Sequence, residues 1–402
     1  MPKYKVTEIL TTSRLDHVRY AIRDLALLAD ELTLQGKSVL MFNVGDPLDS
    51  DFRTPPQLIE AVVKAMRDGK NGYAPALGVG EALDAIRREA QRKGIGNVQD
   101  VFVTQGVSEA VDFCLTALLN PGDELLVPSP GYPLYSAVVS KLGGVLAPYD
   151  LQEELGWEPD LDSLYEKISP RTRGIVLINP NNPTGVVHAR EVLEGIAECA
   201  RRNGLVIFAD EIYDKLVFAG ARHISIAALA PDVPVVTFGG LSKGYLAPGW
   251  RVGWGIVSGN LAAVKNYCEG IHKLLRTRLC ANHAVQYAIR PALEGSQDHL
   301  GEVIRKLQLR RDATVSWCNS TPRLSCVQPK GGFYAFPKLD ILEDDLDFVK
   351  ALLIKKQVLV VHGGGFGQLP GTRHFRFVFL PEENKLKLAY QAIAEFMHEH
   401  AA

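Results

Sequence analysis

Short apolar runs rich in β-branched residues alternate with longer helical stretches through the middle of the chain. The expected strands are 100–105, 123–129, 174–180, 205–212 and 234–240. The helical stretches between them include SEAVDFCLTALL and REVLEGIAECARRNG. Apolar runs of about five or six residues that are bounded by turn signals are typical of buried strands in a mainly parallel sheet. The alternation therefore predicts a large α/β domain, residues 45–290, with helices on both faces of its sheet.

The two ends of the chain show a different pattern, in which long helical stretches dominate. The expected helices are 17–34, 260–292, 300–316 and 384–400. The runs GGFYAFP and HFRFVFL add strand signals near the C-terminus. We expect residues 1–44 and 291–402 to form one smaller α+β domain, assembled from both termini.

The composition is that of an ordinary globular protein and argues against several functional classes. Hydrophobic residues make up 47% and charged residues 22% of the 402 residues. A formal net charge of −2 gives no electrostatic footprint for nucleic acid or an anionic membrane. The sequence starts without an apolar signal region, and no apolar run approaches the roughly 18–20 residues that span a bilayer. Six scattered cysteines without a CxxC pair predict reduced thiols in a cytoplasmic protein and no metal site.

Polar side chains follow the expected strands at their carboxyl ends, where open α/β sheets bind ligands. The third expected strand runs into NPNNPTG, which contains Asn182. The next strand ends at Asp210, and the one after it is followed by Ser242 and Lys243. The first strand runs into GVS (106–108), which opens a helix. Glu211 and Tyr213 come directly after Asp210. One crevice would thus collect an amide, a carboxylate, a phenol, a hydroxyl, an amine and a helix N-terminus.

Each of these residues also has an ordinary structural explanation. Lys243, within GGLSKGYLAPGWRVGW, could be a solvated lysine in a surface turn. Ser108 could be only a helix N-cap, and Asn182 could stabilise a turn. Asp210 could cap the following helix, and Arg251 could pair with a neighbouring carboxylate. All of these structural explanations would have to apply at the same edge of the sheet, which is a stronger requirement than any one of them alone.

One ligand would use this whole set of groups. A carboxylate can pair with a pyridinium nitrogen, while a phenol and an amide can donate to a phenolate oxygen. A serine, an arginine and a helix N-terminus suit a phosphate, because free N–H groups and the helix dipole favour an anion. A lysine in a desolvated site can act as a nucleophile toward an aldehyde. Pyridoxal phosphate has all of these groups, so the sequence predicts it as the cofactor.

Eight segments, taken in order, carry a resemblance to a known family. They are NVGDP, NGYAPALGVGEALDAIR, GVSEA, NPNNPTG, FADEIYDKL, GGLSKGYLAPGWRVGW, PKGGFYAFP and HFRFVFL. With these segments the chain resembles the class I/II aminotransferases of the fold type I pyridoxal-phosphate enzymes over essentially its whole length. Lys243 after Ser242, followed by Gly249 and Arg251, matches the family's cofactor-attachment signature and is the most specific segment. The resemblance implies a mainly parallel seven-stranded sheet between helices, and a homodimer.

The resemblance also implies a role for each residue around the cofactor ring. Lys243 would hold the cofactor's aldehyde and, once released by substrate, would move a proton between the substrate Cα and the cofactor. Asp210 would pair with the ring nitrogen, and Tyr213 and Asn182 would bond the phenolate oxygen. Tyr132 would stack on the ring, although such a tyrosine could instead be a packing residue.

Other residues would hold the phosphate and the substrate. The implied phosphate ligands are Ser242, Arg251, Ser108 and the backbone of Gly106 and Val107. Arg376 in HFRF would bind the substrate α-carboxylate through two hydrogen bonds, and Gly45 in NVGDP would contact the same carboxylate. Tyr73 would reach the cofactor phosphate of a partner subunit, so that two chains of a homodimer share their active sites.

The implied activity is amino-group transfer between an L-amino acid and a 2-oxo acid, by a ping-pong mechanism that uses the pyridoxal and pyridoxamine forms of the cofactor. A clamp of Gly45, Asn182 and Arg376 argues against decarboxylation but leaves a lyase on the same fold open. A transcription regulator with an aminotransferase-like domain would need a DNA-binding module within the first 40 residues or so, which show no such pattern. A dehydrogenase is disfavoured because no GxGxxG follows a strand.

Within the family, the segments PRTRGIVLINPNNPTG, FADEIYDKL and RLCAN most resemble microbial alanine aminotransferases of the glutamate–pyruvate type. We therefore expect alanine and 2-oxoglutarate to give pyruvate and glutamate. Glutamate carries a second carboxylate, for which Arg276 and Arg278 are candidate partners, although either could be a solvated or interface arginine. Gly244 and Leu246 depart from the SKTYRVAGFR of those enzymes. Aromatic, aspartate and broad-specificity aminotransferases therefore stay open.

Overall fold

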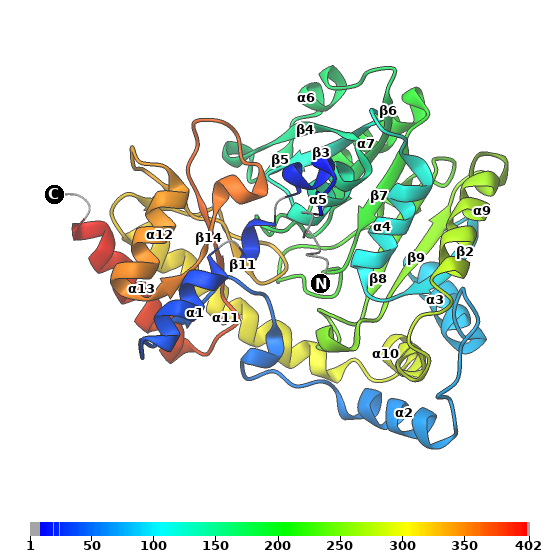
Figure 1. Cartoon of the computed structure of the whole chain (residues 1–402), viewed down its shortest axis with the longest axis horizontal. Coiled ribbons are helices and arrows are strands. Elements are labelled where there is room, and N and C mark those ends of the chain that lie inside the picture. The colour runs from blue at the N-terminus through cyan, green and yellow to red at the C-terminus, as the bar shows by residue number, and fades with distance from the viewer. Residues whose placement is uncertain (1–8, 19, 24, 400–402) are drawn as a thin grey trace, which may run out of the picture.

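The largest sheet of the described chain has eight strands in the order β2-β9-β8-β7-β6-β3-β4-β5 and lies to the right in Figure 1. The computed structural model describes residues 9–18, 20–23 and 25–399. The strands are β2 (Val98–Thr104), β3 (Glu124–Ser129), β4 (Val145–Gln152), β5 (Glu158–Pro159), β6 (Thr172–Ile178), β7 (Val206–Asp210), β8 (Val235–Gly240) and β9 (Gly253–Ser258). All except β9 and β5 run in the same direction, so the sheet is mainly parallel.

The expected α/β class is confirmed, and all five expected strands are present, but the strand count is eight rather than seven. The additional strand is β5, a two-residue segment that pairs with the edge strand β4. The sequence pattern did not single out β4 or β9 either. β4 contains a proline and an aspartate, and three glycines lie within or next to β9, so neither has the β-branched composition of a buried strand.

Helices cover both faces of this sheet because the strand side chains alternate between two core clusters. In β6, Ile175 and Leu177 belong to one cluster, whereas Val176 and Ile178 belong to the other. This is the two-residue period of a strand that is buried on both faces. The first cluster includes α2 (Pro56–Arg67), α3 (Gly80–Arg92), α6 (Leu161–Glu166), α7 (Arg190–Asn203), α8 (Ile226–Leu229) and α10 (Ile289–Glu294). The second includes α4 (Val107–Leu118), α5 (Pro133–Leu142) and α9 (Leu261–Thr277).

A third core cluster lies beside the sheet and draws on both ends of the chain. Figure 1 shows α1 (Ala26–Leu34), in blue, next to the orange and red helices of the C-terminal part. The other elements here are α11 (Asp298–Ser320), α12 (Asp345–Lys356), α13 (Glu383–Glu399), β1 (Leu40–Met41), β10 (Leu324–Ser325), β11 (Tyr334–Ala335), β12 (Lys338–Leu339), β13 (Val358–Leu359), β14 (Val361–His362) and β15 (Phe375–Val378). Leu32 of α1 and Leu353 of α12 share a further small cluster, and β1 pairs with β13. The assignment of 1–44 and 291–402 to a separate domain stays a prediction.

Two expected helices are shorter in the structure than the sequence pattern indicates. The helix expected at 17–34 begins only at Ala26, and short 3₁₀ turns at Ser13–His17 and Ala21–Arg23 precede it. The stretch expected at 260–292 stops after Thr277, because Leu279 has a φ of 78°, which an α-helix cannot accommodate. The helices expected at 300–316 and 384–400 are α11 and α13, and residue 400 lies outside the described residues.

Candidate active site

A pocket of about 340 Å³ lies at the carboxyl ends of the central strands. It is lined by side chains from the loops after β6, β7 and β8, from the start of α4 and from both ends of the chain. Among its lining residues are Gly45, Val107, Ser108, Tyr132, Asn182, Asp210, Tyr213, Ser242, Lys243, Arg251 and Arg376. The crevice expected from the strand ends is therefore present, and it brings together nearly all the site residues named from the sequence.

Asp210 is the last residue of β7 and is buried beneath the pocket. Its carboxylate accepts hydrogen bonds from the hydroxyl of Tyr135 at 3.0 Å and from the backbone N–H of Ile212 at 3.3 Å. Burial raises the pKa of Asp210 to about 6, and the adjacent Glu211 adds to the rise, although the hydrogen bonds and Lys243 oppose it. Because the protein solvates this charge poorly, a cationic ligand group beside Asp210 would be strongly favoured.

Lys243 lies in the loop after β8 and lines the pocket. Its Nζ donates a hydrogen bond to the carbonyl oxygen of Gly45 at 2.8 Å and lies 5.4 Å from the centre of the Phe333 ring. Burial lowers the pKa of Lys243 to about 8, and two nearby arginines act in the same direction against two nearby carboxylates. An amine with this pKa is partly neutral near neutral pH, so it can act as a nucleophile or as a proton acceptor.

Arg376 on β15 is only 1% exposed and reaches the pocket from the third core cluster. Its Nη1 donates to Oδ1 of Asn182 at 3.0 Å, and its Nη2 donates to the carbonyl oxygen of Asn43. The guanidinium lies over the rings of Tyr334 and Phe366, at 4.5 Å and 4.9 Å from their centres. Its Nε has no hydrogen-bond partner in the described part of the chain. A buried guanidinium held in this way is suited to bind a carboxylate.

The start of α4 forms a wall of the pocket that suits an anion. Gly106 is the N-cap of this helix and has a φ of 78°, a conformation that glycine adopts without strain. A Cβ at this position would also collide with the guanidinium of Arg251. Ser108 in the first turn and Ser242 after β8 line the same pocket. A helix N-terminus, two hydroxyls and a guanidinium thus converge, which is the donor set that phosphate prefers.

Three tyrosines of the site were not predicted from the sequence. Tyr20 shares a hydroxyl–hydroxyl hydrogen bond of 2.7 Å with Tyr132, and Tyr334 shares one of 2.9 Å with Tyr213. Tyr135 is the residue that donates to the carboxylate at the end of β7. Burial raises the pKa of Tyr213 and of Tyr132, so both hydroxyls stay protonated and able to donate. Tyr135 lies three residues after Tyr132, a spacing that could have flagged it.

The pocket has more cations than carboxylates among its lining residues. These charged residues are Lys243, Arg251, Arg376, Asp46 and Asp210. Within the residues that the structure describes, none of the three cations forms an ion pair with a carboxylate, whereas cations elsewhere commonly do. The excess of unpaired positive charge predicts a ligand with anionic groups.

Three other residues named from the sequence lie outside the pocket of their own chain. Tyr73 is 81% exposed, in the loop between α2 and α3. Arg278, after α9, donates to two backbone carbonyls and lies 3.2 Å from Glu109. Arg276 donates to a carbonyl of its own helix. Their roles toward a partner subunit or a second substrate carboxylate stay predictions.

Two further findings concern residues 9–18, 20–23 and 25–399, the part that the structure describes. No helix in these ranges is long and apolar enough to cross a membrane. No group of three or more His, Cys, Asp or Glu side chains in them is placed to hold a metal ion. All six cysteines fall within these ranges and are free thiols.

The mainly parallel sheet presents a lysine, a buried carboxylate and a helix N-terminus at one pocket, and the chain as a whole is similar to known proteins. Residues 37–393 match the family described as Aminotransferase class I and II. The chain is 41% identical to the glutamate-pyruvate aminotransferase AlaA of Escherichia coli K12, over 98% of each chain. It is 38% identical to the alanine aminotransferase of Mycobacterium tuberculosis H37Rv, over 96% of this chain and 92% of that protein.

Solved structures give the same result. An aminotransferase from Escherichia coli matches with a TM-score of 0.95 and 41% identity, over 98% of this chain and 99% of that one. The alanine aminotransferase from Pyrococcus furiosus matches with a TM-score of 0.94 and 41% identity, over 97% and 100%. The chain therefore belongs to the class I and II aminotransferases and is an aminotransferase, as the eight sequence segments indicated. Enzymes of this family use pyridoxal phosphate and act on amino acids and 2-oxo acids.

Proposed function

We propose that this protein is an alanine aminotransferase that uses pyridoxal 5′-phosphate. It would transfer the amino group of L-alanine to 2-oxoglutarate, and the products would be pyruvate and L-glutamate. The observation that carries the proposal is the charge pattern of the pocket, in which three cations without an ion-pair partner in the described chain outnumber two carboxylates, Asp46 and the buried Asp210. A cofactor phosphate and a substrate carboxylate would balance the cations, and a protonated ring nitrogen would balance Asp210.

The residues of the pocket fit this cofactor. Asp210, buried and hydrogen-bonded to Tyr135, would pair with the ring nitrogen. Tyr213 and Asn182 would donate to the ring oxygen, and Tyr132 would lie against the ring face. The phosphate would be held by Ser108, Ser242, Arg251 and the backbone of Gly106 and Val107. Gly106 supports this fit, because the guanidinium of Arg251 packs directly against the start of α4, where any side chain at position 106 would collide with it.

When bound, pyridoxal phosphate supplies an aldehyde that condenses with amines and a protonated ring that accepts electrons. Lys243 would remove the proton from the substrate Cα, since its lowered pKa of about 8 leaves part of the amine neutral near neutral pH. Asp210 would keep the ring nitrogen protonated through its negative charge. Arg376, held by Asn182, would bind the substrate α-carboxylate and so keep the Cα beside Lys243, which lines the same pocket.

Two observations support alanine and glutamate as substrates. Relatives that match nearly the whole chain are named glutamate-pyruvate and alanine aminotransferases. The pocket volume of about 340 Å³ is at the small end of the range for ligand sites, which favours a compact substrate next to the cofactor. The second carboxylate of glutamate needs a further cation. We propose that Arg278 or Arg276 of a partner subunit supplies it, since neither lines the pocket of its own chain.

A panel of amino donors tests the proposed activity. The purified protein would be assayed with each of alanine, glutamate, aspartate, phenylalanine and tyrosine, against pyruvate and 2-oxoglutarate. We expect the highest kcat/KM for the alanine and 2-oxoglutarate pair. A kcat/KM about tenfold higher for an aromatic or aspartate donor would reject alanine as the preferred substrate. Release of ammonia without a new amino acid would indicate a lyase.

We also propose that the enzyme is a cytoplasmic homodimer with shared active sites. The exposed Tyr73 would reach the partner's phosphate, and six free thiols suit a reducing compartment. A hybrid dimer of a Lys243→Ala chain and a Tyr73→Ala chain tests the sharing. If sites are shared, both lesions fall in one site, and the other site recovers wild-type cofactor affinity. Activity limited to that of the Tyr73→Ala chain would show that Tyr73 serves its own subunit.

A further inference from the structure

The turn that follows β7 faces the pocket on one side and the end of α3 on the other. Asp210 and Tyr213 line the pocket, whereas Glu211 and Asp214 do not and instead contact the end of α3. Asp210, Ile212 and Tyr213 thus face the pocket, whereas Glu211 and Asp214 face the back of the same tight turn. The turn is closed by hydrogen bonds from the N–H of Asp214 to the carbonyl of Glu211 and from the N–H of Leu216 to that of Tyr213.

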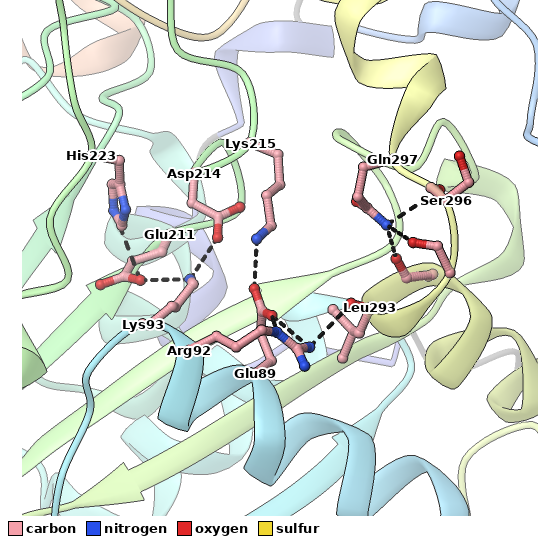
Figure 2. A network of polar contacts seen from close by, with 12 residues as sticks. Glu89, Arg92, Lys93, Glu211, Asp214, Lys215, His223, Leu293, Ser296 and Gln297 are labelled. Atoms are coloured by element: carbon pink, nitrogen blue, oxygen red, sulfur yellow. Dashed lines mark hydrogen bonds and ion pairs between the residues drawn. The ribbon is translucent and has the colours of Figure 1, made fainter.

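Lys93, the C-cap residue of α3, holds the back of this turn (Figure 2). Its Nζ lies 2.8 Å from Oε2 of Glu211 and 2.6 Å from Oδ2 of Asp214. The side chains of Lys93, Glu211 and Asp214 are 15%, 2% and 14% exposed, so this bridge is largely shielded from water. A single ammonium thus ties together two carboxylates of the same turn and joins them to the helix.

Neighbouring charges reinforce the same contact between α3 and the turn. Lys215 donates to Glu89 of α3 at 2.6 Å, and Figure 2 shows this pair beside the Lys93 bridge. Arg92 also bonds Glu89, at 2.8 Å. Nε2 of His223 lies 3.8 Å from Glu211, beyond hydrogen-bonding distance. Within the described chain, Lys93 is therefore the cation in direct contact with Glu211.

The bridge also has an electrostatic consequence for the pocket. Burial by itself would lower the pKa of Lys93, but Asp214 and Glu211 outweigh burial and raise it, so the ammonium stays charged. Glu211 is adjacent in sequence to Asp210, and its negative charge disfavours the ionised form of Asp210. Lys93 contacts this same Glu211 carboxylate, on the side of the turn away from the pocket.

We propose that Lys93 is a positioning residue for the transamination assigned above: by holding Glu211 and Asp214, it fixes the turn that presents Asp210 and Tyr213 to the pocket. The inference rests on the proposed function for its kinetic meaning. Its structural part, that one ammonium orders the 206–218 segment, holds independently of the reaction.

The test compares Lys93→Met, Lys93→Arg and a control, Lys306→Met. Lys306 also bridges two carboxylates, at 3.2 Å from Asp51 and 2.9 Å from Glu302, and it is 26% exposed. Two measurements are made on each protein. The first is hydrogen–deuterium exchange of peptides that cover residues 206–218 in the cofactor-free protein. The second is the single-turnover half-reaction of the pyridoxal-phosphate-loaded enzyme with alanine, which separates the maximal rate constant from the substrate dissociation constant.

For Lys93→Met we expect faster exchange in 206–218 and a maximal rate constant about tenfold to a hundredfold lower, as for outer-shell partners of other sites. The substrate dissociation constant should change by less than about threefold, because Arg376 and Asn182 lie on other elements. Lys93→Arg should restore most of the rate, and Lys306→Met should leave the rate and the exchange of 206–218 unchanged. If Lys93→Met does not fold, Asp214→Asn, which removes one arm of the bridge, should give a smaller loss of the same kind.

A Lys93→Met enzyme with a maximal rate constant within about twofold of wild type would overturn the proposal, as would an equal loss in Lys306→Met. Unchanged exchange in 206–218 would also overturn it, whatever the rate. A wild-type protein that transfers no amino group from any donor would instead count against the proposed function, and the exchange data would still decide whether Lys93 orders the turn.

Discussion

Two lysines flank the turn after β7, and their surroundings are opposite. Lys243, on the pocket side, donates to a backbone carbonyl and forms no ion pair with any carboxylate in the described chain. Lys93, behind the turn, touches two carboxylates within 2.8 Å. Burial lowers the pKa of Lys243 to about 8. For Lys93, burial also acts to lower the pKa, but its carboxylates outweigh that effect and raise it.

Burial favours the neutral amine of both lysines, but their neighbouring groups give them different roles. A buried lysine without a carboxylate partner loses its charge easily and becomes a nucleophile and base. A lysine between two carboxylates keeps its charge and becomes a structural cross-link whose removal leaves two buried anions unpaired. The same contrast separates the pocket cations Arg251 and Arg376, which are open to ligand anions, from Arg310, which is paired with Asp51 at 2.7 Å.

The largest expected effect is that of Lys243→Ala. It removes the amine that would hold the cofactor and move the proton, so the half-reaction with alanine should slow by about 10⁴-fold or more. This exceeds the loss expected for Lys93→Met by at least two orders of magnitude. Borohydride reduction of the cofactor-loaded protein, followed by peptide mapping, should place the label on Lys243. A label on Lys93 or any other lysine would show that Lys243 is not the residue that holds the cofactor.

Asp210 and Glu211 are adjacent residues on opposite faces of the same turn, and their substitution should give unequal effects. Asp210→Asn removes the proposed charge partner of the ring nitrogen and should slow the half-reaction by about 10²–10³-fold, because charge stabilisation in a preorganised site is a large effect. Glu211→Gln removes only a charge behind the turn and should cost about tenfold or less. Single-turnover rates of both variants decide the matter. Equal rates would show that Asp210 is only a structural residue at the end of its strand.

Arg376→Lys tests the open cations of the pocket. Lysine keeps the charge but cannot offer two parallel N–H donors, so the dissociation constant of every amino-acid substrate should rise by about tenfold to a hundredfold. The matched control is Arg310→Lys, at a buried arginine that already has a carboxylate partner, which should leave substrate binding unchanged. The dissociation constants of alanine and glutamate, measured for both variants, test this prediction.

Arg278→Gln tests the distal carboxylate of glutamate. If this variant weakens the binding of alanine and of glutamate equally, Arg278 is excluded as the partner of that carboxylate.

The residues at the strand ends could be predicted from the sequence for a physical reason. Parallel strands bring their carboxyl ends to one edge of a sheet, so Asn182, Asp210 and Lys243 had to lie near one another once the strands were recognised. Gly106 and Ser108 followed from the same argument, because their strand runs directly into a helix. In the structure, Ser108, Asn182, Asp210 and Lys243 line one pocket. Gly106 does not line it but packs against Arg251, which does.

The remaining parts of the site depend on contacts that no local pattern encodes. Tyr20 lies in a segment whose spacing suggested a helix, but the chain there forms 3₁₀ turns and places the tyrosine on Tyr132. No local sequence pattern pairs Lys93 with Glu211, because only the docking of α3 behind the turn brings them together as a shielded bridge. The two-residue β5 has too few residues to give a strand signal.

The smallest expected effect separates the two lysines by pH, in the cofactor-free protein. In the fold the pKa of Lys243 is about 8, against 10.5 in an unfolded chain, so between these values the unfolded state binds more protons. Folding stability contributed by Lys243 should therefore rise with pH in this window, by about 1 kcal/mol per pH unit. Lys243→Met lacks the penalty of charging a buried amine, so it should be more stable than wild type at pH 7.5, and the difference in stability should narrow toward pH 10.

The pKa of Lys93 is raised instead, so the stabilisation that Lys93 contributes is fully present below pH 10.5 and is lost only at higher pH. The Lys93→Met protein should thus be less stable than wild type by a constant amount across the same window. Tm values of the three proteins at pH 7.5, 9 and 10 measure both differences. A Lys243→Met curve that runs parallel to wild type would mean that burial does not shift the pKa of Lys243, and the contrast between the two lysines would then have no electrostatic basis.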